Sequence, residues 1–335
     1  MFRIISFGYA DGPTYLDNQA LGNIWQKHAD SNKLASLKVS LDPAITGRYA
    51  SFHLDYLLAT GNNNLFEAHK SVLNTPTELA LTACNMALDR AGVSATDVRL
   101  ILADTVTPAQ VTPSEAQRLA CLLGVKVPCF DIVAGDNCIA VFLNYLSNLE
   151  LNPTETLDKP YYVLCFSSNT LSQFISYSDP LSSYYLGDGA GAMLLAYSAE
   201  KGFKIEKCQL NNSVFKDSPI KVSFDKHIDF NFSSAKEQIC ARYEYVKEQF
   251  FSFSGTEDTM VIGPNWFSTE VLELASMLKI RPELVSAAVL NNAYTFGARE
   301  MHYLAKNIGT VKNSKSVCIF TPGLNGTSGL VVLRS

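Results

Sequence analysis

The stretch CFDIVAGDNCIAVFLNYL, residues 129–146, carries three local structural signals in one short segment. Its first five residues predict a short buried strand, Ala134-Gly135 predicts a tight turn, and the apolar run from about Cys138 predicts a helix. A turn between a strand and a helix directs side chains and free backbone N–H groups into one pocket, and helix N-termini favour developing negative charge. We therefore expect the functional centre at this turn, among the residues 136–138.

Each candidate side chain has a chemical interpretation and a structural alternative. Cys138 is either a nucleophile whose pKa is lowered at the helix N-terminus or a small buried residue in the first helical turn. Asp136 either orients a base or interacts with the helix dipole. Asn291 and Asn292 follow a predicted strand at residues 287–290. Their amides either donate to a substrate carbonyl or bond to their own backbone in a turn.

Composition excludes several classes of protein. The chain has 335 residues, of which 47% are hydrophobic and 18% charged, the profile of a packed globular protein. Its net charge of −5 does not suggest nucleic-acid binding. No apolar run approaches the roughly 20 residues that span a bilayer, and the first residues, MFRIISFGYADGP, do not have the pattern of a signal peptide. Eight cysteines lie far apart without a CxxC pair, so we expect no metal site and a reduced, cytoplasmic protein.

Helix and strand signals alternate outward from the central turn. Thr75 and Pro76 offer a helix start, and Gly92 a helix end. A second helix is expected at residues 114–123, before Gly124. Apolar strands are expected at residues 2–8, 98–103, 161–166 and 192–197. By contrast, the polar residues 11–75, which include three consecutive asparagines, predict an irregular surface or lid region.

The second part of the chain repeats the pattern of the first. Residues 268–292 match the plan of residues 77–104, a helix followed by a capping loop and a buried strand. After them, 298–309 parallels 114–124 and 316–323 parallels 128–135. Such self-similarity predicts two copies of one α/β unit, at about 1–200 and 201–335. Buried apolar strands that alternate with helices predict helices on both faces of each sheet, and hence a five-layered αβαβα architecture.

Two further motifs carry alternatives. The glycine run 187–192, GDGAGA, precedes an apolar strand, whereas a dinucleotide-binding loop follows a strand and opens a helix. A tight glycine turn at a strand start is the better interpretation. None of the five histidines lies at a predicted strand end; His53 and His69, in the lid region, are the two that a pocket would most easily reach.

Three segments together carry a resemblance to a known family. They are residues 119–135 (LACLLGVKVPCFDIVAG), 184–197 (YYLGDGAGAMLLAY) and 321–335 (TPGLNGTSGLVVLRS). With them the chain resembles the β-ketoacyl-ACP synthase III group of the thiolase superfamily from its first residue to its last. The resemblance implies the thiolase-like fold, no cofactor, acyl-CoA or an acyl carrier protein (ACP) as the acyl donor, and a dimer.

The resemblance also implies a Cys, a His and an Asn that act together, and this sequence departs from that pattern. The family's Cys stands five residues after a strand Asp; counted from Asp131, that position is Asp136, and Cys138 lies two residues further. The family's His lies at a strand end that corresponds to residues 261–264, where no His occurs. Its Asn falls on Asn292. Asp136, Cys138 and Asn292 are therefore the candidate catalytic residues.

These departures lead to three hypotheses. A carboxylate at the nucleophile position forms only a reactive anhydride with an acyl group, and losing one oxyanion donor costs on the order of 10²–10³ in rate. We therefore expect a catalytically impaired subunit, in fatty-acid or polyketide-type biosynthesis, that pairs with itself or with a related active synthase. The first alternative is an active acyltransferase or condensing enzyme that uses Cys138, and the second is a thioester hydrolase or decarboxylase that uses Asp136 as its base. The basic pair Lys312 and Lys315 offers only a small contact for a carrier protein.

Overall fold

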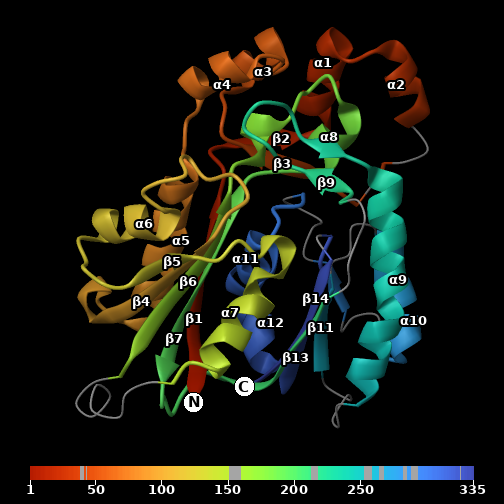
Figure 1. The fold of residues 1–335 in the computed structure, drawn as a ribbon. Helices are drawn as coiled ribbons and strands as arrows, with labels where there is room; N and C mark the ends of the chain where they lie inside the picture. Colours follow the sequence, from red (N-terminus) through yellow and green to blue (C-terminus); the bar gives the residue numbers. More distant parts are fainter. Residues whose placement is uncertain are drawn as a thin grey trace.

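The computed structural model describes residues 1–37, 41–42, 44–150, 160–212, 218–252, 259–263, 268–281, 285–287, 293–324 and 326–335. The strands of the first part of the chain are β1 (Phe2–Asp11), β4 (Val98–Asp104), β5 (Cys129–Asp131), β6 (Tyr162–Asn169) and β7 (Gly189–Tyr197). Those of the second part are β8 (Phe203–Asn212), β11 (Thr259–Gly263), β12 (Val285–Ala287), β13 (Ser316–Pro322) and β14 (Thr327–Arg334). These strands form one sheet in the order β12-β11-β13-β14-β8-β1-β7-β6-β4-β5 (Figure 1).

The two ends of this sheet have the same internal order. From the centre outward, β1-β7-β6-β4-β5 mirrors β8-β14-β13-β11-β12. In both series the first two pairings are antiparallel and the last two are parallel. The predicted duplication is therefore present in the topology. The domain boundary near residue 200 stays a prediction.

The register of the repeat differs from the one that the sequence predicts. The helices that follow the corresponding strands are α5 (Pro76–Ala91), α6 (Glu115–Leu123) and α7 (Cys138–Ser147), then α9 (Phe232–Phe251), α10 (Ser268–Leu278) and α11 (Ala298–Lys306). By strand order α10 corresponds to α6, and α11 to α7, so the expected matches were displaced by one strand–helix unit. Amphipathic helices and apolar strands of similar length look alike in sequence, and only the pairing of the strands distinguishes one unit from the next.

Helices and sheet form the expected five layers. In Figure 1, α5 and α6 cover one outer face, α9 and α10 cover the opposite face, and α7 and α11 lie between the two halves of the sheet. A core of buried apolar residues joins both central helices to strands of both halves, for example Phe142 of α7 with Met301 of α11. Each central helix therefore begins inside the protein, where the two halves meet.

The glycine run is part of strand β7. A Cβ at Gly191 would lie 2.6 Å from the Ala298 carbonyl oxygen and 2.7 Å from the His302 nitrogen, so the missing side chain lets α11 approach the sheet. Gly189 is the first residue of the strand. The interpretation as a strand start rather than a nucleotide loop agrees with this position, but the strand begins three residues before the expected Ala192, so residues 189–191 belong to the strand and not to a tight turn.

Local helix signals near α5 and α6 are confirmed. Thr75 and Glu78 form a reciprocal capping box, and Gly92 ends α5 in the left-handed conformation at φ 65°. Ser114 caps α6 in the same way, and Gly124 ends it at φ 70°. These boundaries depend on residues within a few positions of one another, which is why the sequence predicts them well.

The prediction of an irregular segment at residues 11–75 is wrong. The segment folds into α1 (Asn18–His28), α2 (Ser31–Leu37), α3 (Leu54–Thr60) and α4 (Leu65–Ser71), with a two-stranded sheet of β2 (Thr14–Asp17) and β3 (Gly47–Ala50). Strands β9 (Ile220–Lys221) and β10 (Asp229–Phe230) form a second small sheet, and α8 (Pro180–Tyr185) and α12 (Ile308–Asn313) are two further short helices.

Two of the three consecutive asparagines in this segment have structural roles, one buried and one exposed. Asn62 is fully buried, and its side-chain amide donates to the carbonyl oxygens of Ser172, Gln173 and Ile175 at 2.9–3.2 Å. Asn64 caps α4. Because the partners of Asn62 lie about a hundred positions away, local sequence patterns identify the asparagines only as loop residues. Among the described residues, no helix is both long and apolar enough to cross a membrane.

Candidate functional site

The predicted strand, turn and helix are present around residue 136, but the prediction that the strand is buried is wrong, because β5 lies at the edge of the sheet and Phe130 is 51% exposed. Strand β5 ends at Asp131, two residues before the predicted end, a 3-10 turn covers Gly135–Asn137, and α7 begins at Cys138. Gly135 has φ 60°, a left-handed conformation that favours glycine. The turn therefore has the sharp geometry that the sequence predicts.

A buried carboxylate behind the turn holds its backbone in place. Asp104, the last residue of β4, accepts hydrogen bonds from the Ala134 N–H at 2.8 Å and the Gly135 N–H at 3.1 Å. Its other oxygen accepts one from the Ser167 hydroxyl at 2.7 Å. Burial raises the pKa of Asp104 to about 7, although these three donors oppose the rise. The sequence analysis missed this residue, and the only signal was an acid at the end of an apolar strand.

Asp136 lies on the opposite side of the turn and lines a cavity of about 390 Å³. Its Oδ2 accepts hydrogen bonds from the Tyr294 hydroxyl at 2.8 Å and the Leu324 N–H at 2.7 Å. Burial raises the pKa of Asp136, whereas the Leu324 N–H, the Arg299 guanidinium and the Tyr294 hydroxyl lower it. The residue at the cavity wall of this turn is thus a carboxylate with two donors from the second half of the chain.

The wall of this cavity is mainly apolar. Its apolar lining includes Val106, Pro108, Ile220, Val222, Phe224 and Phe296. A neighbouring cavity of about 350 Å³ shares Pro108 and Phe224 and is lined by His69. One lid histidine therefore lies next to the Asp136 cavity, whereas His53 is exposed at the start of α3. No Lys, Arg or His is among the described residues that line the Asp136 cavity.

Cys138 points away from the cavity. Its side chain is fully buried, and its Sγ donates to the Gly297 carbonyl oxygen at 2.9 Å. Burial, with nearby Asp104 and Glu300, raises the pKa of the Cys138 thiol well above its usual value. A thiolate nucleophile needs the opposite shift and access to substrate. Geometry therefore favours the structural alternative for Cys138.

A charged pair lies behind the cavity wall. The guanidinium of Arg299 bonds to the carboxylate of Glu300, and both side chains are buried. The guanidinium carbon also lies 4.9 Å from the centre of the Tyr294 ring. This arrangement places a positive group behind the tyrosine that contacts Asp136. Tyr294 and Arg299 were not identified from the sequence, because nothing in their immediate neighbours indicates a contact with residue 136.

The remaining predicted residues contribute less. Asn291 and Asn292 lie outside the described residues, so the proposed role of Asn292 stays a prediction. Of the stretch that corresponds to the family's His, Val261 to Gly263 form the end of β11, and Pro264 lies outside the described residues. Asn137, next to Asp136, donates through its side chain to the Thr327 carbonyl oxygen. It therefore connects the turn to β14.

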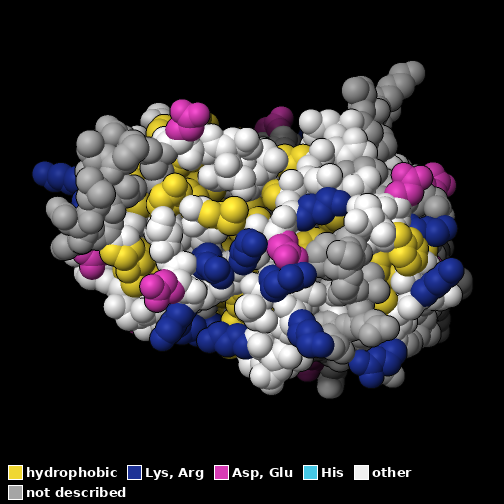
Figure 2. Space-filling model, turned by 90° about the horizontal axis from the view of Figure 1, so that it is seen from below, with side chains coloured by type: hydrophobic (Ala, Val, Ile, Leu, Met, Phe, Trp, Pro, Cys, Tyr) yellow, Lys and Arg dark blue, Asp and Glu magenta, His cyan; other side chains and the backbone are white. Residues whose placement is uncertain are grey.

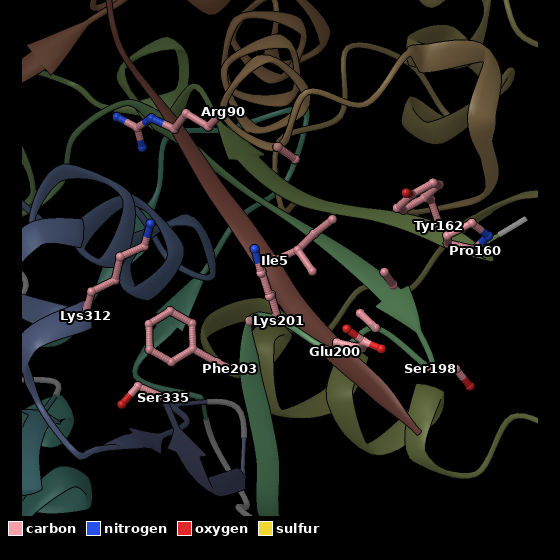
Figure 3. A pocket seen from close by; sticks show the side chains of 14 residues that line it. Ile5, Arg90, Pro160, Tyr162, Ser198, Glu200, Lys201, Phe203, Lys312 and Ser335 are labelled. Carbon is pink, nitrogen blue, oxygen red and sulfur yellow. The ribbon is translucent and has the colours of Figure 1, made fainter.

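A larger cavity of about 860 Å³ lies elsewhere and shares no described lining residue with the Asp136 cavity. Arg90, Lys201 and Lys312 line it together with apolar side chains such as Ile5 and Phe203 (Figure 3). Figure 2 views the molecule from the end where both termini lie and shows Lys and Arg side chains over much of that face. Its charged and exposed character distinguishes this cavity from the apolar one at Asp136.

Comparisons with known proteins agree on one group. The family model for 3-oxoacyl-[acyl-carrier-protein] synthase III matches residues 156–213. The β-ketoacyl-[acyl-carrier-protein] synthase III of Vesicomyosocius okutanii is 28% identical over 171 residues, which cover 51% of this chain and 53% of that protein. The corresponding enzyme of Porphyra umbilicalis is 32% identical over 137 residues, 40% of each chain. The chain thus spans about half the length, or less, of the curated relatives it matches.

Solved structures support the same fold over the whole chain. The 3-oxoacyl-[acyl-carrier-protein] synthase III of Aquifex aeolicus has a TM-score of 0.76 at 20% identity, with 100% of both chains covered. A type III pentaketide synthase from Neurospora crassa has a TM-score of 0.79 at 15% identity, with 99% of both chains covered. These define the class of fold, which is thiolase-like. Together with the sequence matches, they show that this chain is similar to β-ketoacyl-ACP synthase III proteins and shares their fold.

Proposed function

We propose that this chain handles acyl thioesters in fatty-acid or polyketide-type biosynthesis as a catalytically impaired subunit that partners an active synthase. The observation that carries the proposal is the carboxylate at the cavity wall. Asp136 lines the cavity, whereas Cys138, the one thiol at the turn, is buried against Gly297. A carboxylate attacks a thioester poorly, because the anhydride that would form is less stable than the thioester, so no acyl-enzyme is expected to accumulate. Acyl-CoA or an acyl carrier protein is the acyl donor that we propose for the pair.

The edge of the sheet supports a role in assembly. Strand β5 ends the sheet and pairs only with β4 among the described strands. Phe130 in this strand is 51% exposed, and Val133 just after it is 71% exposed. An unpaired edge with large apolar side chains is a ready surface for a second chain. This edge lies directly before the central turn, so a partner seated there would lie near the Asp136 cavity.

The test is acylation of the purified chain. After incubation with a series of acyl-CoA and acyl-ACP donors, intact-mass spectra are expected to show no acyl adduct, and the thioester concentration is expected to stay constant. The matched variant Asp136→Cys places a thiol at the cavity wall and is expected to accept an acyl group there. The double variant Asp136→Cys, Cys138→Ala keeps the new thiol, so its adduct would assign the acyl group to position 136.

The alternatives give different results in the same experiment. An adduct on the wild-type chain that disappears in Cys138→Ala would favour an active acyltransferase or condensing enzyme and contradict the proposal. Loss of thioester without an adduct, abolished in Asp136→Asn, would favour a hydrolase or decarboxylase. The partnership is tested by light scattering, alone and with a related synthase. Phe130→Lys is expected to abolish any association that uses β5 while leaving the fold intact, because this side chain is half exposed.

A further inference from the structure

Asp136 occupies a position where two donors from distant segments converge. The Tyr294 hydroxyl and the Leu324 N–H both bond to the same oxygen, Oδ2, at 2.8 and 2.7 Å. Tyr294 precedes α11, and Leu324 lies in the loop between β13 and β14. Two donors fixed by separate parts of the fold, aimed at one buried oxygen, are the arrangement that proteins use to bind an anionic oxygen.

The charges around this position are mixed, and a cation lies behind it. Arg299 is 2% exposed, and its Nη1 has no hydrogen-bond partner among the described residues. The carboxylate of Glu300 offsets part of this charge through its bond to Arg299, and Asp104 acts on Asp136 from the other side of the turn. With Tyr294, these are the titratable and charged groups that act on Asp136 in the part of the chain that the structure describes. The hydroxyl, the N–H and the guanidinium all favour an anion on Oδ2.

We infer that the Tyr294 hydroxyl and the Leu324 N–H form an anion-binding position that this chain fills with its own Asp136 carboxylate. The ligand class that fits the vacated position is a small carboxylate, or the anionic oxygen of a bound acyl group. While Asp136 stays in place, a second anion cannot bind to the two donors, which are already bonded to Asp136, and the Asp136 carboxylate repels it. The inference deepens the proposed function and rests on the same cavity, since it gives a reason why the site stays closed to anionic substrates.

The test is chemical rescue of the full-length chain. Asp136→Ala removes the carboxylate and leaves both donors. Its melting temperature is expected to fall below that of the wild type, and potassium acetate is expected to raise it by on the order of 2 °C more than the same concentration of potassium chloride. The wild type is expected to show no such difference. Acetamide, which has the shape of acetate without the charge, is the control ligand, and it is expected to have little effect.

The double variant Asp136→Ala, Tyr294→Phe assigns the effect to the donor. It keeps the aromatic ring and loses the hydroxyl, so most of the response to acetate is expected to disappear. Equal shifts with acetate and acetamide, or equal shifts in wild type and Asp136→Ala, would overturn the inference. Retention of the full acetate response in the double variant would remove Tyr294 from the site.

Tyr294→Phe alone keeps the inference testable if Asp136→Ala does not fold. The hydroxyl stabilises the ionised carboxylate more than the protonated one, so its loss is expected to lower the melting temperature more above the raised pKa of Asp136 than below it, and the comparison is made at about pH 8 and about pH 4. An equal loss at both pH values would show that Asp136 is not the anionic occupant. The acylation experiment is independent of these results. An acylated wild type with intact acetate rescue would contradict the proposed function alone, and the reverse pattern would contradict only the inference.

Discussion

The two faces of the central turn differ in what they expose and in what holds them. On the cavity face, Asp136 accepts from the Tyr294 hydroxyl and the Leu324 N–H, both of which belong to the second half of the chain. On the buried face, Asp104 fixes the turn backbone and Cys138 donates to Gly297. Residues two positions apart in a helical turn point about 200° away from each other. Only one of Asp136 and Cys138 can therefore face the cavity, and the chemistry of this site depends on which one does.

The largest expected effect comes from crowding the buried face. A Cβ at Gly297 would lie 2.4 Å from the Gly135 carbonyl oxygen and 2.7 Å from both Asp104 Oδ2 and Cys138 Sγ. Because these atoms belong to the turn and to its anchor, they have no room to move apart. We expect Gly297→Ala to lower the free energy of unfolding by more than ~3 kcal/mol, measured by urea denaturation.

The matched control for this prediction is Gly309→Ala. Gly309 lies in α12, and a Cβ there meets nothing within 4 Å. We expect this variant to be neutral or slightly stabilising, because alanine is the better helix former. If both variants had the same stability, the buried face would not be the tightly packed side of the turn.

The charge of Asp104 on the buried face of the turn makes the stability of the protein depend on pH. Its pKa of about 7 in the folded chain exceeds the value of 3.8 for an unperturbed Asp. Between these values the folded state binds more protons than the unfolded state, so the free energy of unfolding falls as the pH rises through this window. Asp104→Asn keeps the shape, can still accept from the Ala134 and Gly135 N–H groups, and carries no charge. We expect it to be more stable than the wild type by roughly 3–4 kcal/mol above pH 7, and close to the wild type near pH 4.

The measurement is thermal or urea unfolding of both proteins across that pH range. Burial also raises the pKa of Asp188, to about 6, and this residue contributes to the same window in both proteins. The difference between the two profiles isolates Asp104. If the free energies of unfolding of the two proteins changed with pH in the same way, the pKa of Asp104 would be close to its usual value. Burying its charge would then not destabilise the turn.

How much of the fold the sequence predicts depends on how far apart the partners lie. The capping box of Thr75 and Glu78 and the helix end at Gly92 involve neighbours in the chain, and they are predicted correctly. Asn62 is misread because its partners lie at residues 172–175. The distance between partners also explains why the sequence predicts the repeat but not its register. The sequence indicates duplicated strand–helix units, but the pairing of strands, which fixes their register, is set by contacts between distant segments.

The site follows the same rule. The turn and the candidate pair Asp136 and Cys138 come from local patterns, yet the direction of each side chain depends on the exact start of the helix. Tyr294 and Leu324 reach Asp136 across 158 and 188 positions, and no local pattern points to them. Asp104 is the exception, since an acid at the end of an apolar strand is a visible anomaly and could have been identified.

The smallest expected effect concerns the buried thiol. Cys138 fills space beside Gly297 and donates one weak hydrogen bond, so Cys138→Ala is expected to cost only about 1–2 kcal/mol of unfolding free energy. The rate at which Cys138 is alkylated tests its burial more directly than stability does. Cys121 on α6 is exposed in the same chain and serves as the internal reference. Under native conditions, iodoacetamide is expected to alkylate Cys121 long before Cys138, as peptide mapping would show. Comparable rates would mean that the thiol reaches solvent, and the assignment of the two faces would then have to be reversed.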